Sequence, residues 1–274
     1  MKTVVITGSA RGLGLEMAKV FLKNNINVVI SDLNKDRLEN AKEILKSIDT
    51  KAKFDGVVCD VTKINDIVNL IKYTKENFNS IDIWINNAGV NQPDKAIWEL
   101  SKEEIDLVLD VDLKGAIIGS KLVMEEMIKQ KSGAIYNIEG YGSNDAKMLG
   151  LSIYGTSKRA ITYFTEALAK ESDERKTNVI VGKLSPGIMI TDFITNALGD
   201  KEKINLPEKT KKVYNILGDY PWTVAEFLVN KIITNKKNGA KIEWLTNRKA
   251  AFRFFTCAFN KRDFFKEDVW KEQR

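Results

Sequence analysis

The stretch Lys2-Thr3-Val4-Val5-Ile6-Thr7-Gly8-Ser9-Ala10-Arg11-Gly12-Leu13-Gly14 decides the fold, because it joins a β-branched run to a glycine-rich turn. Residues 2–7 predict a strand, and the apolar spacing of residues 15–23 predicts a helix. Glycines let the backbone turn tightly and approach a pyrophosphate, which the amide groups and dipole of the following helix attract. This order indicates a dinucleotide site. We expect it to be lined by Gly8, Ala10, Arg11, Gly12, Leu13 and Gly14.

Strands and helices alternate along the rest of the chain. Apolar runs predict further strands at 27–31, 54–59, 81–85, 134–138 and 178–184, and helical spacing predicts helices from 35 and over 64–78, 102–129 and 152–172. Such alternation predicts an α/β fold, a Rossmann-like doubly wound parallel sheet with helices on both faces and a ligand site at the carboxyl ends of its strands. We expect one catalytic domain over residues 1–235 and a C-terminal helical extension over 236–274.

Composition limits the class of protein. The 274 residues are 43% hydrophobic and 29% charged, which is typical of a soluble globular domain. The amino-terminal apolar run is too short for a signal peptide, and no run is long enough to span a bilayer, so we expect a cytoplasmic protein. Cys59 and Cys257 lie far apart, which argues against a disulfide framework or a thiolate metal site.

The chain contains no histidine. This excludes Ser-His-Asp and Cys-His nucleophile systems and zinc sites built on imidazole. Acid–base chemistry must therefore fall to Tyr, Lys, Asp or Glu, and we expect no metal site.

Tyr154 and Lys158 are the leading candidates for that chemistry. In the predicted helix 152–172 they lie one turn apart on one face. A phenol with a solution pKa of about 10 needs a neighbouring positive charge to exchange protons near neutrality, and Lys158 can supply it. The alternative is an ordinary exposed pair on an amphipathic helix.

Asp32 bears on the choice of cofactor. It closes the second predicted strand, where a carboxylate, next to Leu33, can bind the adenosine ribose hydroxyls and repel a 2′-phosphate. Arg11 favours NADP instead, because a guanidinium can pair with that phosphate. We give Asp32 the greater weight and expect NAD, although Asp32 can also simply cap the next helix. Asp60 and Val61, after the third strand, are placed to meet the adenine.

Five motifs together resemble the short-chain dehydrogenase/reductase family over roughly residues 2–195. They are Thr7-Gly8-x-x-x-Gly12-x-Gly14, Asp60-Val61, Asn86-Asn87-Ala88-Gly89, Tyr154-x-x-x-Lys158 and Pro186-Gly187. The resemblance implies that Tyr154 is the proton donor or acceptor, that Lys158 lowers its pKa and holds the nicotinamide ribose, and that a homodimer or homotetramer forms. It also implies cofactor contacts at Asn87, Ala88, Gly89, Pro186, Gly187, Ile188 and Thr191.

Two positions depart from the family pattern. Asp112 stands where the family usually has an Asn that holds the water of a proton relay. The Ser-Ser pair after the fifth strand is replaced by Glu139-Gly140-Tyr141-Gly142-Ser143, so Ser143 is our candidate to polarise the substrate oxygen, with Ser152 in reserve. This replacement is similar to the chlorophyll b reductase-like branch, which reduces a formyl group of a chlorin.

The tail carries the formal net charge of +6, with eleven Lys or Arg and five Asp or Glu between 236 and 274. Phe252, Phe255 and Phe259 share one face of a predicted helix there. We expect that face to pack on the domain or on a partner subunit, with a substrate lid or weak contact with an anionic membrane surface as alternatives. We expect no nucleic-acid partner.

The sequence thus predicts an NAD(P)-dependent oxidoreductase that interconverts a carbonyl and an alcohol on a bulky, largely apolar substrate. A chlorophyll(ide) b reductase-like activity competes with a steroid, bile-acid or acyl-chain hydroxy dehydrogenase. A non-catalytic nucleotide sensor or scaffold on the same fold is the alternative of another class. Residues 192–220 are the expected place for a mobile substrate lid.

Overall fold

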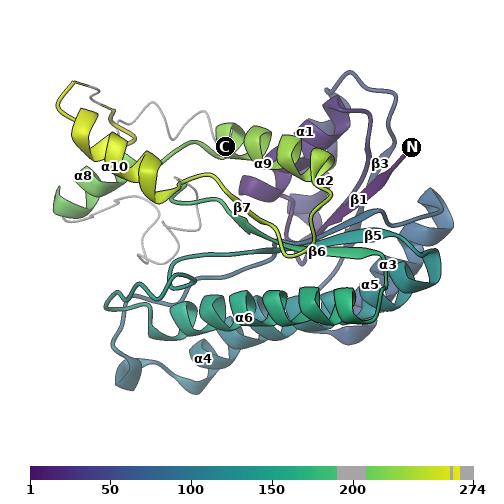
Figure 1. The fold of residues 1–274 in the computed structure, drawn as a ribbon, viewed down its shortest axis with the longest axis horizontal. Coiled ribbons are helices and arrows are strands. Elements are labelled where there is room, and N and C mark those ends of the chain that lie inside the picture. Colours follow the sequence, from purple (N-terminus) through teal and green to yellow (C-terminus); the bar gives the residue numbers. More distant parts are fainter. Residues whose placement is uncertain (190–207, 260–261, 266–274) are drawn as a thin grey trace.

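A computed structural model describes residues 1–189, 208–259 and 262–265. Within them one fully parallel sheet of seven strands has the order β3-β2-β1-β4-β5-β6-β7 (Figure 1). The strands are β1 Thr3–Ile6, β2 Asn27–Asp32, β3 Phe54–Val58, β4 Ile83–Asn86, β5 Gly133–Ile138, β6 Val179–Ser185 and β7 Lys241–Glu243. The strand order reverses between β1 and β4, and a ligand crevice is expected beyond the carboxyl ends of these two strands.

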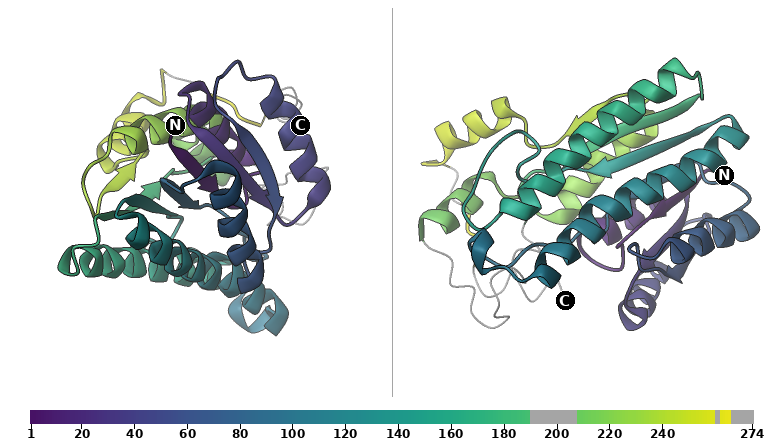
Figure 2. Two further views of the ribbon diagram at one scale, coloured as in Figure 1. Left: turned by 90° about the vertical axis from the view of Figure 1, so that its right-hand side faces the viewer. Right: turned by 90° about the horizontal axis from the view of Figure 1, so that it is seen from below.

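Helices cover both faces of the sheet, as predicted (Figures 1 and 2). One face carries α1 Gly12–Lys23, α2 Lys35–Lys46 and α9 Pro221–Thr234, and the other carries α3 Ile64–Phe78, α5 Ala116–Gln130 and α6 Ser152–Glu174. The remaining elements are η1 Ile97–Glu99, α4 Lys102–Val108, the π-helical turn η2 Leu109–Gly115, α8 Glu208–Leu217 and α10 Asn247–Thr256. None of the described helices is both long and apolar enough to span a bilayer.

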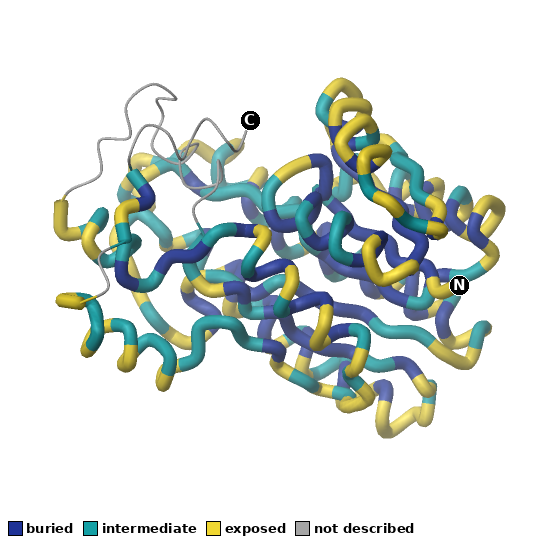
Figure 3. Tube along the Cα trace, turned by 90° about the horizontal axis from the view of Figure 1, so that it is seen from above, coloured by how far each residue is buried: buried dark blue, intermediate teal, exposed yellow. Residues whose placement is uncertain are grey.

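The core lies on either side of the central strands, where the tube in Figure 3 is buried. Successive residues of a strand point to opposite faces, so Val4 and Ile6 pack toward Phe21 of α1, whereas Val5 packs with Val123 of α5. Because both faces are covered, the central strands β1, β2 and β4 are mostly apolar rather than alternating.

Three features of the structure differ from the sequence expectations. The predicted helix 102–129 is interrupted by η2, a single π-helical turn that carries Asp112 into the interior. The sheet continues past residue 235, because β7 pairs with β6 inside the expected extension. In α10 the side chains of Phe252 and Phe255 are exposed, so this aromatic face does not pack on its own domain, while packing on a partner subunit stays a prediction. Residues 192–207 of the expected lid lie outside the described residues.

Candidate active site

The glycine turn after β1 lies against the turn after β4. A Cβ on Gly8 would lie 2.6 Å from Ala88 Cα, and one on Gly14 would lie 2.7 Å from Asn87 Nδ2. Gly8 and Gly12 also have φ values of +59° and +57°, which favour glycine. A Cβ on Gly12 would meet no atom within 4 Å, so open space borders the turn at the start of α1, where a pyrophosphate is favoured.

Hydrogen bonds join these two turns. Thr7 Oγ1 accepts from the backbone amides of Asn87 and Ala88, each at 3.1 Å. Asn87 Nδ2 in turn donates to the carbonyl oxygens of Thr7 and Gly8, each at 2.9 Å. The turns are therefore held together at the switch point between β1 and β4, where an α/β sheet binds its dinucleotide.

Asp32 closes β2 as expected, but its carboxylate has a partner that sequence reasoning missed. Its Oδ1 accepts from the backbone amide of Asn34 at 3.0 Å and from Arg37 Nη2 at 2.8 Å. Arg37 lies in the first turn of α2. Its position five residues after Asp32 is the sequence feature from which this ion pair could have been predicted. A 2′-phosphate here would meet a carboxylate and a guanidinium together, while the neighbouring Leu33 is exposed.

Asp60 and Val61, predicted to meet the adenine, follow β3. Asp60 Oδ1 accepts from the Thr62 amide at 3.0 Å and from the Thr62 hydroxyl at 2.7 Å. Burial raises the pKa of Asp60, but these hydrogen bonds and Lys63 outweigh it, so the pKa is lowered. Val61 packs against Gly115 of η2. The contact of this pair with adenine stays a prediction.

Tyr154 and Lys158 lie in the first two turns of α6, and both side chains are buried. Lys158 Nζ is 5.4 Å from the centroid of the Tyr154 ring, which brings the predicted pair together. The start of α6 is fixed by Gln92, whose Oε1 accepts from the backbone amides of Ile153 at 2.7 Å and Tyr154 at 2.9 Å. Gln92 is a positioning residue that no local pattern identifies.

Asp112 reaches the same place from η2. Its Oδ2 lies 2.8 Å from Lys158 Nζ, and its Oδ1 accepts from the Val90 amide at 2.7 Å. Burial lowers the pKa of Lys158, but the carboxylate of Asp112 more than offsets this, so the pKa is raised and the ammonium form is held. The structure therefore replaces the amide of the family pattern by a buried ion pair with Lys158.

This ion pair changes the expected behaviour of the phenol. Burial raises the pKa of Tyr154 to about 12, with Lys158 lowering it and Asp112 and Tyr214 adding to the rise. Lys158 lowers the pKa of Tyr154, as predicted. The net pKa is nevertheless raised, because the phenol is buried away from water and the carboxylate of Asp112 opposes the ammonium of Lys158.

The loop after β5 places Gly140, rather than Ser143, against the phenol. A Cβ on Gly140 would lie 2.3 Å from Tyr154 Oη. Ser143 Oγ donates to the carbonyl oxygen of Lys158 at 3.1 Å and accepts from the Gly140 amide at 3.2 Å. Polarisation of the substrate by Ser143 thus stays a prediction that requires its hydroxyl to leave Lys158. The reserve candidate, Ser152, is exposed at the start of α6.

Glu139, in place of the first Ser of the family pair, is buried and faces two lysines. Its Oε1 accepts from Thr162 Oγ1 at 3.0 Å and lies 3.9 Å from Lys183 Nζ, and its Oε2 lies 3.7 Å from Lys241 Nζ. These contacts tie the loop after β5 to α6, β6 and β7, and so hold Gly140 beside Tyr154.

The predicted nicotinamide side follows β6. Pro186 is buried, and Gly187 has φ +74° with its Cα packed against Leu245, as the turn requires. The carbonyl oxygen of Ile188 accepts from the Asp219 amide at 3.0 Å, which ties this turn to the start of α9. Thr191 lies outside the described residues.

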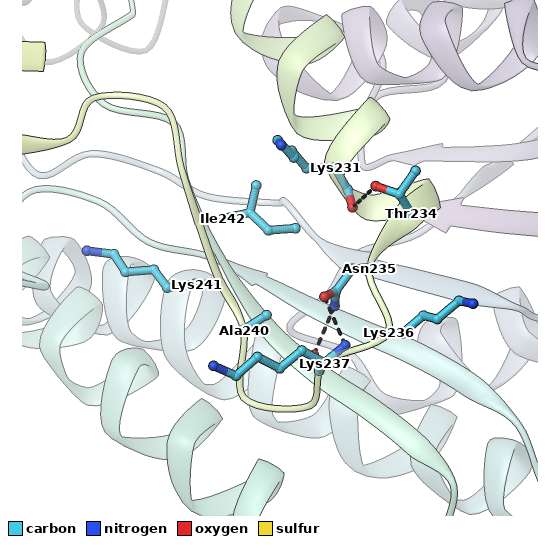
Figure 4. Close-up of a pocket in the computed structure, with 8 residues that line it drawn as sticks. All are labelled: Lys231, Thr234, Asn235, Lys236, Lys237, Ala240, Lys241 and Ile242. Atoms are coloured by element: carbon cyan, nitrogen blue, oxygen red, sulfur yellow. Dashed lines mark hydrogen bonds between the residues drawn. The ribbon is translucent and has the colours of Figure 1, made fainter.

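A basic hollow of about 530 Å³ lies elsewhere, between the end of α9 and β7 (Figure 4). Four lysines line it, Lys231, Lys236, Lys237 and Lys241, and Asn235 donates from its side chain to the Tyr136 hydroxyl beside it. The hollow shares no residue with the set around Tyr154. It is therefore not the predicted substrate site.

The parallel sheet and the glycine turn at its switch point are typical of NAD(P)-binding α/β proteins. A family model for short chain dehydrogenases matches residues 2–202, and the chain belongs to this family, an oxidoreductase family that uses NAD or NADP. It is 33% identical over 261 residues to the probable chlorophyll(ide) b reductase NYC1 of Arabidopsis thaliana, covering 89% of this chain and 51% of that protein. It is 34% identical over 260 residues to the chlorophyll(ide) b reductase NOL of the same plant, covering 92% and 72%.

A solved structure confirms the fold. The model superposes on levodione reductase with a TM-score of 0.82 and 22% identity, covering 91% of this chain and 98% of that one. The chain spans about half the length of the NYC1 relatives from Arabidopsis thaliana and rice. The comparisons thus establish the family and the fold, and they leave the substrate open.

Proposed function

We propose that this protein interconverts a carbonyl and an alcohol with Tyr154 as proton donor or acceptor. The observation that carries the proposal is the buried set of Tyr154, Lys158 and Asp112, which α6 and η2 bring together. A phenol that is buried together with an ammonium is typical of acid–base work rather than of a structural core.

In reduction, a bound reduced nicotinamide supplies the hydride to the carbonyl carbon. Tyr154 Oη donates its proton to the carbonyl oxygen, and the alcohol forms. Lys158 keeps its ammonium close to the phenolate that is left, and Asp112 keeps Lys158 protonated. In oxidation the phenolate accepts the hydroxyl proton. The high pKa of Tyr154 keeps the side chain as the neutral phenol at neutral pH, which is the form that donates the proton in reduction.

We propose NAD as the preferred cofactor. Asp32 supports this choice, because it stands at the end of β2 where it can accept from the ribose hydroxyls. Its ion pair with Arg37 weakens the argument against NADP. Fluorescence titration tests the preference: we expect tighter binding of NADH than of NADPH. The opposite order would assign the 2′-phosphate to Arg37 or Arg11.

We propose a bulky, largely apolar substrate. The loops after β4 and β5, whose strands end at the crevice, carry exposed apolar side chains, among them Trp98, Met148 and Leu149. The plant relatives are named for chlorophyll(ide) b reduction, which supports a formyl group on a large apolar ring system. A steroid, bile acid or acyl chain fits the same description. A screen with both cofactors against chlorins, steroids and long-chain aldehydes separates these classes.

A nucleotide sensor on the same fold is the second candidate. Gly140 and Asp112, where the family usually has Ser and Asn, are the observations that favour it. Reduced-cofactor binding without turnover of any compound in that screen would support the sensor and refute the proposed activity.

A further inference from the structure

Helix α10 turns its aromatic side outward. Phe252 and Phe255 lie in α10 and Phe259 follows three residues after its end, and 67%, 84% and 90% of their surfaces are exposed. Arg248 lies four residues, or about one helical turn, before Phe252 and is also exposed. Solvent-exposed aromatic clusters of this kind mark interaction sites.

The charged side of α10 faces the protein. Arg253 Nη1 lies 2.6 Å from Asp219 Oδ2, and Arg262, after the helix, lies 3.3 Å from Asp219 Oδ1. Trp244 Nε1 donates to Asp219 Oδ2 at 2.6 Å. A single carboxylate thus anchors the tail, and α10 packs on α8 (Figure 1). The usual arrangement of an amphipathic helix, apolar inside and polar outside, is reversed.

A hollow of about 220 Å³ opens between the end of α8 and α10. Lys249, Arg253 and Arg262 line it together with the apolar side chains of Ile216 and Phe252. Among the described residues, Asp219 is the carboxylate that faces Lys249, Arg253 and Arg262. The described lining of the hollow therefore carries more positive than negative charge. Burial, with Arg253 and Arg262, lowers the pKa of Lys249 to about 8 against the opposing effect of Asp219.

We propose that α10 and this hollow dock on an anionic lipid bilayer. Phe252, Phe255 and Phe259 enter the boundary of the acyl chains, and the hollow lined by Lys249, Arg253 and Arg262 receives a phosphate head group. The proposal does not depend on the catalytic activity.

Charge decides between a bilayer and a second copy of this chain. Helix α10 contains no acidic residue, and α8 beside it carries Lys209, Lys211 and Lys212 with one acid, Glu208, already paired to Lys211 at 2.8 Å. A symmetric contact between two such faces would bring cations against cations. An anionic surface complements the same charges.

Sedimentation of the full chain with phospholipid vesicles tests the proposal. We expect binding to vesicles with about one third phosphatidylserine, weak binding to pure phosphatidylcholine, and loss of binding as salt is raised. Replacing Phe252, Phe255 and Phe259 by Ser should weaken binding at least about tenfold. Lys249→Gln should weaken it several-fold.

Tyr163→Ser is the matched control, because Tyr163 is an aromatic residue of α6 with 75% of its surface exposed and lies outside this face. We expect it to bind as the wild type does. Unchanged thermal unfolding shows that each variant is folded. Equal binding by the triple Ser variant and the wild type would overturn the proposal. The proposal would also be overturned if the wild type did not bind vesicles and formed an oligomer that the triple Ser variant did not form. The partner of this face would then be a second copy of the chain.

Discussion

The ion pair between Asp112 and Lys158 makes Asp112→Asn the most informative single change. Asparagine keeps the size of the side chain and an oxygen that can accept from the Val90 amide, but it removes the negative charge. Lys158 then stands uncompensated beside Tyr154. We expect the pKa of Tyr154 to fall, because the carboxylate that raises it is gone while the ammonium that lowers it remains.

The geometry sets the size of this effect. Asp112 Oδ2 lies 2.8 Å from Lys158 Nζ, which lies 5.4 Å from the ring centroid of Tyr154, so the carboxylate is at most about 8 Å from the ring. A unit charge at about 8 Å with an effective dielectric constant of about 20 contributes about 2 kcal/mol, or about 1.5 pH units. Asp112→Asn also lowers the pKa of Lys158. Whichever of Tyr154 and Lys158 loses its proton first, the pair should therefore lose that proton at lower pH than in the wild type.

Phenolate absorbance in the near ultraviolet measures this without a substrate. Subtracting the absorbance titration of the double variant Asp112→Asn/Tyr154→Phe from that of Asp112→Asn leaves the signal of Tyr154 alone. The same subtraction of Tyr154→Phe from the wild type gives the reference pKa, expected at about 12. Asp110→Asn, on the same π-helical turn but paired with Lys114 at the surface, is the control and should leave the titration unchanged. A Tyr154 pKa in Asp112→Asn that equals or exceeds that of the wild type would refute the electrostatic account.

Three further changes test other parts of the structure. Gly8→Ala forces a Cβ to 2.6 Å from Ala88 Cα at positive φ, so we expect about 1–3 kcal/mol of destabilisation and weaker NADH binding by calorimetry; Gly239→Ala, with φ +68° and its nearest contact at 4.0 Å, should show the smaller backbone cost alone. Ser143→Ala removes a hydrogen bond to the Lys158 carbonyl, and we expect a loss of about 1 kcal/mol in urea unfolding; a fall in kcat of about a hundredfold would support polarisation of the substrate by Ser143, and a fall of less than about tenfold would contradict it. Asp219→Ala leaves two partly buried arginines without their carboxylate, so hydrogen exchange in α10 should rise and the unfolding free energy should drop by about 2–3 kcal/mol; protection equal to that of the wild type would contradict the anchor.

The parallel sheet and the proximity of Tyr154 to Lys158 could be predicted because their signals are local. The apolar strand runs and the glycine turn lie within short windows, and Tyr154 and Lys158 are one helical turn apart. The predicted helix 64–78 coincides with α3. Each of these features depends on backbone geometry that neighbouring residues set by themselves.

Other features depend on contacts that the local pattern does not contain. The residues of η2 are compatible with an α-helix, and the π-helical turn shows only in the burial of Asp112 against Lys158. Gln92 holds the start of α6 from 62 positions before Tyr154. The outward aromatic side of α10 follows from the pairing of Arg253 with Asp219, which lie 34 positions apart. Tertiary contacts therefore determine these three features, and they outweigh the helical periodicity of the sequence.

The central claim is that Tyr154 transfers the proton in a nicotinamide-dependent reduction, and one comparison tests it most directly. Initial rates of NADH and NADPH oxidation would be measured against a panel of chlorin, steroid and long-chain carbonyl compounds, with wild type and Tyr154→Phe side by side. Calorimetry would confirm that both bind the cofactor equally. We predict turnover of at least one compound by the wild type and a loss of at least about a hundredfold in Tyr154→Phe. A Phe variant that turns over as fast as the wild type would contradict the account.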